Sequence, residues 1–368
     1  MKKVALYIPS MNGGGAQRVM VTLANGLAQE EIKVDLVLNQ STGPYMSDIS
    51  DKVNVITLNT SRALTSIVPL SRYLRKEKPS TILSAMHYVN IITVVAKIIS
   101  FTDVRVVLSE HNNLTASLNN NNRVVFNFIF LKLMSWAYKR SDAIVAVSDG
   151  VANDLSNRIN ICRDMITTIY NPIVTPELLK SINSSEPLDH PWFQNSTIPV
   201  IIAVGRLTSQ KNFTLLINAF TKVINKIDAN LFILGEGEMR SQLEDQIKHL
   251  NLQNKVELHG FVSNPYKWMS KSDLFVLSSK YEGFGNVLVE AMACGTPVIS
   301  TNCPSGPSEI LDNGKWGELV PINDIDTLSE SIIRTLNNSN ISTKNLVERA
   351  KKFSLNQAVK NYLKVLIP

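Results

Sequence analysis

The stretch from Lys280 to Ile310 reads KYEGFGNVLVEAMACGTPVISTNCPSGPSEI. Its polar, glycine-broken start ends where Asn286 is placed to cap a helix, because apolar residues recur at helical spacing after it. We expect the backbone N–H groups of Gly285 to Leu288 to form an anion site with the helix dipole. Glu282 lies on the loop and Glu290 in the second helical turn, so a phosphate fits between two carboxylates that can accept sugar hydroxyls.

The spacing is equally compatible with an ordinary loop and helix that carry one exposed and one partly buried acidic residue. The identities of the residues are more specific than their spacing, because Glu-x7-Glu followed by AMACGTPVI resembles the signature of the retaining glycosyltransferases of family 4. The resemblance covers nearly the whole chain and is strongest from Gly205 to Glu309. It implies the GT-B fold, an α/β architecture of two Rossmann-like, doubly wound domains that face each other across a cleft.

A chain of 368 residues with 44% hydrophobic content fits two domains. Three cysteines without metal-ligand spacing suit a reducing compartment, and no signal-peptide pattern follows Met1, so we expect a cytoplasmic protein. The longest apolar runs are interrupted by lysines and are shorter than the roughly 20 residues that span a bilayer. The net charge of +6 allows anionic lipid or phosphorylated ligands as partners, whereas no nucleic-acid motif is present.

Short β-branched runs alternate with helical patterns, seven runs in the first half of the chain and six in the second. Such alternation predicts βαβ units and parallel sheets. We therefore predict an N-terminal acceptor domain at 1–172, a linker at 173–197 and a C-terminal donor domain at 198–352. The helical pattern at 353–368 resembles the GT-B helix that crosses back to the first domain.

A glycine-rich loop, SMNGGGAQRV, follows the first expected strand. Consecutive glycines let the backbone approach a ligand closely and leave helix N–H groups for a phosphate, although a tight strand–helix turn is the alternative. Arg18 stands at the third glycine position of a dinucleotide fingerprint, so the loop is not of that type. The family's corresponding loop has glutamate where this chain has Gln17, and the resemblance implies a binding role for Gly14 and Gly15.

The second domain opens with VGRLTSQKN at a strand end. Arg206 and Lys211 lie five positions apart across this loop and can converge on one diphosphate, although two unrelated surface cations are the alternative. The resemblance implies that they act with Gly205 to neutralise the nucleotide diphosphate as it leaves. No Asp-x-Asp pair suits a divalent metal at this site, so we expect a metal-independent enzyme.

The resemblance also assigns contacts with the donor at several strand ends. It places Glu282 on the transferred sugar, Glu290 on the ribose hydroxyls, and the nucleotide beside Glu236, Phe261, Val262, Gly285, Asn286 and Val287. For the turns after two of these strands, LGEG and HGFV, a plain strand–helix connection is the alternative.

A histidine, His111, follows a strand-like run in the sequence Ser-Glu-His-Asn. A lone histidine after a strand is more often structural. Its position nevertheless resembles that of the family's active-site histidine, which lies beside the transferred sugar. Glu110 is placed either to orient His111 or to line the acceptor site.

The stretch from Arg123 to Arg140 predicts a helix with two different faces. One apolar stripe suits packing on the sheet, and consists of Phe126, Phe130, Leu133 and Ala137. The other face mixes rings with cations, as anionic membrane surfaces favour, and consists of Phe128, Lys132, Trp136 and Lys139. A helix buried on both sides with lysines reaching to water is the alternative.

The resemblance implies a retaining hexosyltransferase without a cofactor. The expected donor is UDP-GalNAc, then UDP-Gal or UDP-GlcNAc, and the expected acceptor is a lipid-linked (polyprenyl-diphosphate) saccharide of bacterial lipopolysaccharide, O-antigen or capsule synthesis. We expect peripheral binding to the inner face of the cytoplasmic membrane.

A nucleotide-sugar epimerase of the same fold is one rival, which would change its sugar without an acceptor. A non-catalytic sugar-nucleotide-binding assembly partner is another, disfavoured by Arg206, Lys211, Glu282 and Glu290.

Overall fold

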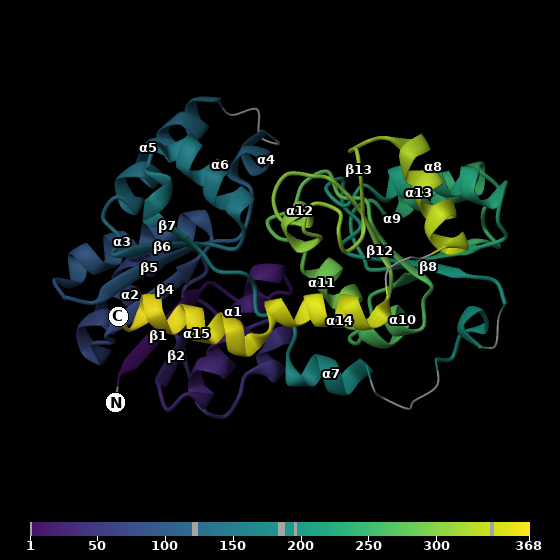
Figure 1. Ribbon diagram of the computed structural model, residues 1–368. Coiled ribbons are helices and arrows are strands. Elements are labelled where there is room, and N and C mark those ends of the chain that lie inside the picture. The colour runs from purple at the N-terminus through teal and green to yellow at the C-terminus, as the bar shows by residue number, and fades with distance from the viewer. Residues whose placement is uncertain (1, 120–123, 183–187, 195–196, 339–341) are drawn as a thin grey trace. The chain divides into compact units, whose positions relative to one another are not determined.

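The computed structural model describes residues 2–119, 124–182, 188–194, 197–338 and 342–368, with only the backbone of Asn119 and of 124–126. The chain divides into two compact units. Unit 1 comprises Met1–Pro172 and Ser354–Pro368, and unit 2 comprises Ile173–Phe353 (Figure 1). Within the described residues each unit holds one parallel sheet, so the expected α/β class with two doubly wound sheets is confirmed.

The sheet of unit 1 has the order β3-β2-β1-β4-β5-β6-β7. Its strands are β1 (Lys3–Ile8), β2 (Lys33–Leu38), β3 (Val53–Thr57), β4 (Thr81–Ala85), β5 (Arg105–Glu110), β6 (Ala143–Ala146) and β7 (Ile166–Thr168). Most of these strands are near-continuous apolar runs, because helices cover both faces of a parallel sheet. The order reverses beside β1, so the carboxyl ends of β1 and β4 flank the point where doubly wound sheets bind ligands.

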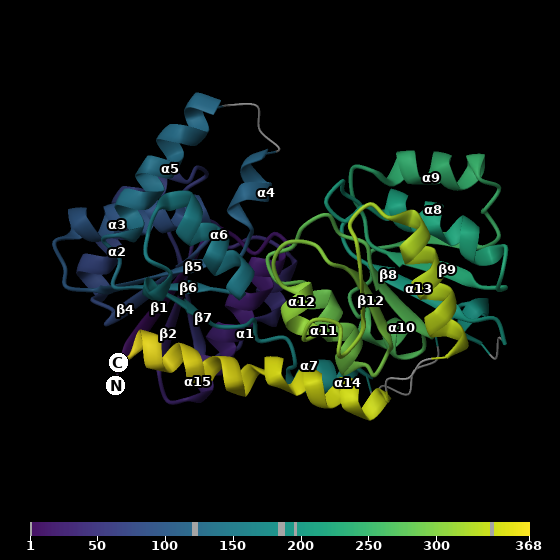
Figure 2. The ribbon, with the colours of Figure 1, turned by 45° about the horizontal axis from the view of Figure 1, so that its top comes forward.

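The helices of unit 1 form two layers (Figure 2). They are α1 (Gly15–Gln29), α2 (Ile67–Glu77), α3 (His87–Ser100), α4 (Leu114–Asn119), α5 (Val124–Tyr138), α6 (Asp149–Ile159) and α15 (Leu355–Leu366). Helices α1 and α15 share the core on one face of the sheet, while α2, α3, α5 and α6 pack side by side in succession.

The C-terminal helix α15 is held in unit 1 by close packing and by hydrogen bonds. A Cβ at Gly26 of α1 would lie 2.7 Å from side-chain atoms of Leu355 and Val359, so glycine permits the close approach of α15. The hydroxyl of Thr81 donates to the carbonyl of Leu366 at 2.6 Å. The end of the chain is therefore fixed next to the start of β4.

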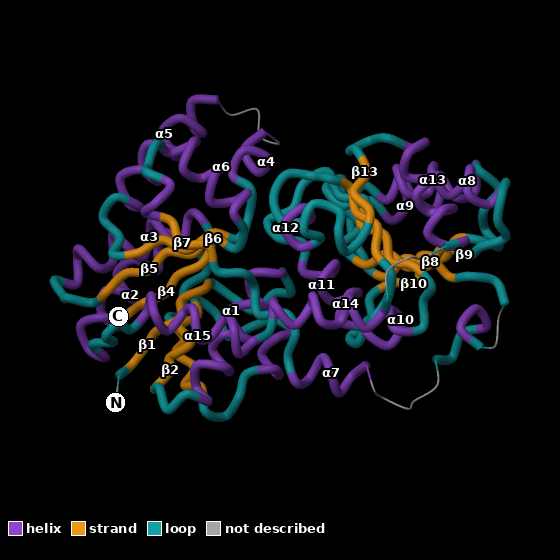
Figure 3. The backbone as a smooth tube through the Cα atoms, in the orientation of Figure 1, coloured by secondary structure: helices purple, strands orange, loops and turns teal. Residues whose placement is uncertain are grey.

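The sheet of unit 2 has the order β10-β9-β8-β11-β12-β13. Its strands are β8 (Val200–Val204), β9 (Asn230–Leu234), β10 (Val256–Gly260), β11 (Leu274–Leu277), β12 (Val298–Thr301) and β13 (Glu318–Val320). Its helices are α7 (Pro176–Ile182), α8 (Phe213–Ile224), α9 (Arg240–His249), α10 (Tyr266–Ser270), α11 (Asn286–Ala293), α12 (Pro307–Ile310), α13 (Ile325–Asn337) and α14 (Thr343–Ala350). Helices α8, α9 and α13 share one apolar core on one side of these strands (Figure 3).

Each of the thirteen predicted runs contains a strand, whereas the predicted linker at 173–197 differs from expectation. Helix α7 forms within it and packs against α10 of unit 2. Its 3₁₀ turn Pro191–Phe193 precedes β8, and the ring of His190 packs edge-on against Phe232 of β9. The segment therefore belongs to unit 2, because its aromatic residues are part of the packing there.

Candidate functional site

The loop after β8 places Lys211 against Gly205. A Cβ at Gly205 would lie 3.1 Å from Cε of Lys211, so glycine leaves room for the lysine side chain. The ammonium group of Lys211 forms an ion pair with Oε1 of Glu282 at 2.6 Å, and the two side chains are only 16% and 9% exposed. Two residues that the sequence assigns to different parts of the donor therefore contact each other directly.

The loop that carries Glu282 is fastened to the Lys211 loop by further hydrogen bonds. The hydroxyl of Ser278 donates to the carbonyl of Lys211 at 2.8 Å, and the N–H of Lys280 donates to the carbonyl of Gln210 at 2.8 Å. The hydroxyl of Ser279 donates to the same Glu282 oxygen as Lys211, at 2.7 Å. The carboxylate is thus held at the carboxyl ends of β8 and β11, where parallel sheets bind ligands.

Arg206 lies on the same loop with an exposed side chain. Within the described residues its guanidinium forms no ion pair, in contrast to the ammonium group of Lys211. The structure therefore does not bring Arg206 into the Lys211–Glu282 pair, and its charge is accessible to a ligand.

The N-cap residue of helix α11 is Gly285, not the predicted Asn286. Gly285 is the N-cap residue with φ of 97°, a left-handed conformation that glycine adopts without strain. Asn286 is already helical, and the N–H of Leu288 donates to the carbonyl of Gly285 at 2.9 Å. The predicted anion site is therefore wrong in two details, because Asn286 does not cap and the Leu288 N–H is used within the helix start.

A second loop closes over the start of α11. Gly306 has φ of 97°, and a Cβ there would lie 1.8 Å from the carbonyl oxygen of Phe284. The N–H of Glu282 donates to the carbonyl of Pro304 at 3.2 Å. This contact fixes the backbone around Glu282, while Glu290 is buried in the second turn of α11.

The turn after β9 also adjoins the Gly205 loop, and the end of β10 is hydrogen-bonded to that turn. The N–H of Leu207 donates to the carbonyl of Glu236 at 2.9 Å, while the Glu236 carboxylate pairs with Arg240 at 2.7 Å. Phe261 is 74% exposed, and Val262 beside it is half-buried. An exposed ring at a strand end can stack on a nucleobase.

In unit 1 the glycine loop ends at Gly14, the N-cap residue of α1, and the helix begins at Gly15. A Cβ at Gly14 would lie 2.3 Å from Oε1 of Gln17, so the Gln17 side chain folds back over Gly14. Gln17 therefore lies against the start of α1, where the resemblance implies a binding role for Gly14 and Gly15.

His111 is buried directly after β5. Its Nε2 and the hydroxyl of Ser109 lie 3.0 Å apart within hydrogen-bonding distance. Burial, and then the charge of nearby His87, lower the pKa of His111 to about 4. The imidazole is therefore neutral near pH 7, which suits a group that hydrogen-bonds a sugar hydroxyl.

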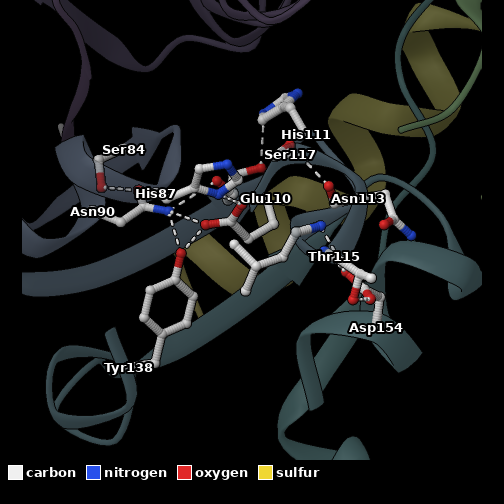
Figure 4. A network of polar contacts seen from close by, with 12 residues as sticks. Ser84, His87, Asn90, Glu110, His111, Asn113, Thr115, Ser117, Tyr138 and Asp154 are labelled. Atoms are coloured by element: carbon white, nitrogen blue, oxygen red, sulfur yellow. Dashed lines mark hydrogen bonds and ion pairs between the residues drawn. The ribbon is translucent and has the colours of Figure 1, made fainter. Parts of the chain in front are cut away.

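The expectation that Glu110 orients His111 is wrong. Successive strand residues point to opposite faces of the sheet, so Glu110 points away from its neighbour. It accepts hydrogen bonds from His87 at 2.6 Å and from Asn90 at 2.9 Å, and a further one from the hydroxyl of Tyr138 (Figure 4). Sequence reasoning missed these three partners, and the alternation along β5 was the available signal.

The described residues offer neither a metal site nor a membrane-spanning helix. No group of three or more His, Cys, Asp or Glu side chains is arranged to hold a metal ion. The Asp-x-Asp of the sequence, Asp324 and Asp326, caps α13 through Asp324 and pairs with Lys222 through Asp326. No described helix is long and apolar enough to cross a membrane.

The two halves match known family models. The model for Glycosyltransferase Family 4 matches residues 13–176, and that for Glycosyl transferases group 1 matches residues 186–353. A 4-alpha-N-acetylgalactosaminyltransferase of Campylobacter jejuni, which acts on N-acetylgalactosamine-N,N'-diacetylbacillosaminyl-diphospho-undecaprenol, is 30% identical over 382 residues and 100% of both chains. The chain belongs to glycosyltransferase family 4.

A second C. jejuni relative of this family 4 glycosyltransferase is 26% identical over 387 residues, covering 100% of this chain and 98% of the relative. It is an alpha-1,4-N-acetyl-D-galactosaminyltransferase whose name specifies a GalNAc-alpha-(1->4)-GalNAc-alpha-(1->3)-diNAcBac-PP-undecaprenol substrate.

Solved structures support the fold. Anabaena HepE in complex with UDP has a TM-score of 0.79 at 19% identity and covers 100% of this chain and 99% of its own. The lipopolysaccharide outer core galactosyltransferase WaaB has a TM-score of 0.76 at 18% identity and covers 99% of each chain. At such identities the likeness shows the fold alone, and the fold of this glycosyltransferase is GT-B.

Proposed function

We propose that this glycosyltransferase transfers N-acetylgalactosamine from UDP-GalNAc to a lipid-linked saccharide of bacterial surface polysaccharide synthesis. UDP-Gal and UDP-GlcNAc are the next candidate donors. The full-length match to the C. jejuni enzyme carries the proposal, because that relative transfers N-acetylgalactosamine to a diphospho-undecaprenol-linked acceptor. The second C. jejuni relative has the same transferred sugar and the same lipid carrier in its name.

Unit 2 holds the donor in this proposal. Arg206 and Lys211 bind the diphosphate with the backbone of Gly205 and of 285–287, and Glu290 binds the ribose hydroxyls. Phe261 and Val262 contact the base, with Glu236 at the border of the nucleotide site. The clustering of these residues around the connected ends of β8, β9 and β11 supports the assignment.

The proposed reaction retains the configuration of the sugar. The bond between the sugar C1 and the UDP oxygen breaks, and the acceptor oxygen bonds to C1 from the same face. The acceptor hydroxyl proton passes to the departing diphosphate. Arg206 and Lys211 stabilise the charge that develops on that diphosphate, so the reaction needs neither a metal nor a cofactor. The alpha linkages in the relatives' names agree with retention from an alpha-linked nucleotide sugar.

His111 contacts the transferred sugar in this scheme, while Glu282 accepts its hydroxyls. The low pKa of His111 keeps the ring neutral. The Glu282 carboxylate is held by Lys211 and Ser279, so it presents a fixed acceptor to the ligand.

A donor screen tests the proposed function. The purified chain is incubated with UDP-GalNAc, UDP-Gal or UDP-GlcNAc, with and without a GalNAc-terminated acceptor on a prenyl diphosphate, and UDP release is measured. We expect UDP release that requires acceptor and is fastest with UDP-GalNAc. A sugar altered without acceptor would instead identify an epimerase.

Glu290→Gln should weaken the binding of UDP alone, measured by calorimetry, if this carboxylate binds ribose.

We further propose that α5 binds the inner face of the cytoplasmic membrane, where the lipid-linked acceptor lies. Phe128 and Ile129 are each 61% exposed on this helix. Lys132 lies over the Phe128 ring at 5.6 Å, and Arg140 lies over the Trp136 ring at 4.8 Å. An exposed ring and a half-buried ring, each beside a cation, suit the headgroup layer of an anionic membrane.

The buried face of α5 differs from the predicted stripe. Met134, Ala137 and Tyr138 are buried, whereas Leu133 is 43% exposed. The hydroxyl of Tyr138 bonds to Glu110, so Tyr138 lies on the packed side of α5. The packed side is therefore rotated about the helix axis relative to the predicted stripe. Arg123 and the side chain of Phe126 lie outside the described residues. The rotation adds Leu133 and Ile129 to the exposed apolar surface.

Changing Lys132, Lys139 and Arg140 together to Gln should weaken binding to anionic vesicles roughly 100-fold, because each cation contributes about 1 kcal/mol. Vesicle flotation measures the effect, and activity on a soluble acceptor analogue should survive. The matched control removes three exposed cations from unit 2, by Lys226, Lys248 and Lys271→Gln. Equal flotation of the two triple variants, or none with wild type, would contradict the membrane role.

A further inference from the structure

A buried polar network surrounds Glu110 at the end of β5 (Figure 4). Glu110 is 1% exposed. Its Oε1 accepts hydrogen bonds from Nδ2 of Asn90 at 2.9 Å and from the hydroxyl of Tyr138. Its Oε2 lies 2.6 Å from Nδ1 of His87. A carboxylate this deeply buried is costly unless charged or polar partners surround it, and here both of its oxygens are bonded.

The network is satisfied at every buried member. Asn90 accepts from the hydroxyl of Ser84 at 2.7 Å, and its Nδ2 donates to the hydroxyl of Tyr138 at 2.8 Å. Tyr138 in turn donates to Glu110. The exception is Nε2 of His87, for which no hydrogen-bond partner exists among the residues that the structure describes. This nitrogen is the point at which the network is open to a ligand.

The position of His87 favours contact with a substrate. His87 is the first residue of α3, separated by one residue from the end of β4, and its side chain is 16% exposed. The carboxyl ends of β4 and β5 are adjacent in the sheet, so His87 and His111 lie at the same sheet edge. Nδ1 faces Glu110, which leaves Nε2 on the other side of the ring.

The electrostatic surroundings favour the imidazolium form of His87. Burial alone would lower the pKa of His87, but the carboxylates of Glu110 and, more weakly, Asp154 raise it, and the net shift is upward. The positive end of the α3 dipole by itself disfavours a cation at this position, and it favours an anion beside the ring. An anion at Nε2 would be stabilised by both the imidazolium and the helix start.

We propose that His87 is a further binding residue in unit 1, which donates its Nε2–H to a phosphate oxygen of a substrate while Glu110 holds the ring. The inference rests on the proposed function, in which both substrates carry a diphosphate. A charged donor on a phosphate forms a strong hydrogen bond. The diphosphate belongs either to the UDP donor or to the lipid-linked acceptor, and binding measurements separate the two.

The test compares His87→Gln with the matched control His190→Gln, which alters the His190–Glu257 pair of unit 2. His87→Gln should raise either the KM for donor and the Kd for UDP, or the KM for acceptor, roughly 10- to 100-fold. Inorganic pyrophosphate should compete less well against the affected substrate. The binding form is protonated, so wild-type affinity should fall as pH rises through the His87 pKa, a dependence that His87→Gln should lack.

A measurement on the wild-type chain covers the case in which His87→Gln fails to fold. Long-range nitrogen–proton spectra of the histidine rings should show that His87 keeps both ring protons to a higher pH than His111 does, with an Nε2 signal that shifts when UDP or pyrophosphate is added. A neutral ring, an unshifted signal, or unchanged constants in a folded variant would overturn the inference. Absence of transfer by wild type would instead contradict the proposed function, while the ring spectra can still be measured.

Discussion

The Arg206→Ala variant is expected to lose transfer activity roughly 30- to 900-fold, which corresponds to about 2 to 4 kcal/mol for one electrostatic group in the transition state. The charge on the diphosphate grows as the sugar leaves, so kcat should fall more than donor affinity. Because the Arg206 side chain is exposed, its removal should leave the melting temperature unchanged. Steady-state kinetics and thermal unfolding of the same preparation measure both quantities.

The matched control for this variant is Arg334→Ala, which removes an exposed guanidinium that pairs with Glu318 on the surface of unit 2. Surface pairs of this kind contribute at most about 1 kcal/mol, so this variant should differ little from wild type in stability and in activity. Turnover of Arg206→Ala within twofold of wild type would remove Arg206 from the reaction.

The strands of both units could be predicted because their signal is local. A parallel strand covered on both faces is mostly apolar, so β1 and β4 can be recognised as short, mostly apolar runs between turn residues. Glycine loops at strand ends could be predicted equally well, since the φ of 97° at Gly285 favours glycine and the Lys211 side chain packs closely on Gly205.

The errors arose where a side chain has a choice of partners in space. Glu110 can orient His111 only if the two side chains lie together. The direction of each side chain depends on the face of the sheet to which its position at the end of β5 turns it. The face of α5 was misjudged for a related reason. Tyr138 carries a polar hydroxyl, and burial of this residue is favourable only because the hydroxyl forms hydrogen bonds with Glu110 and Asn90. No periodicity in the sequence reports such a partner.

The pairing of Lys211 with Glu282 was also beyond sequence reasoning, since the residues are 71 positions apart. The resemblance assigned Lys211 to the diphosphate and Glu282 to the sugar. The structure adds that each residue neutralises the other within unit 2. Replacing Lys211 therefore has a structural consequence that replacing Arg206 lacks.

Lys211→Met is expected to lower both activity and stability. Activity should fall roughly 30- to 900-fold, as for Arg206, because a second cation is lost from the diphosphate site. Stability should fall by up to about 3 to 5 kcal/mol, the cost of leaving a buried carboxylate without its partner. Glu282→Gln should lower the free energy of unfolding less than Lys211→Met does, since the amide oxygen can still accept hydrogen bonds from Lys211 and Ser279.

The double variant Lys211→Met/Glu282→Gln separates the two effects. Removing the unpaired charge should recover most of the unfolding free energy that Lys211→Met loses, measured by urea denaturation. Activity should stay as low as in Lys211→Met, because the neutral pair supplies no cation to the departing diphosphate. Recovery of activity together with stability would show that Lys211 serves only to hold Glu282. Low stability in the double variant would show instead that the lysine side chain packs against Gly205 in a way that methionine cannot replace.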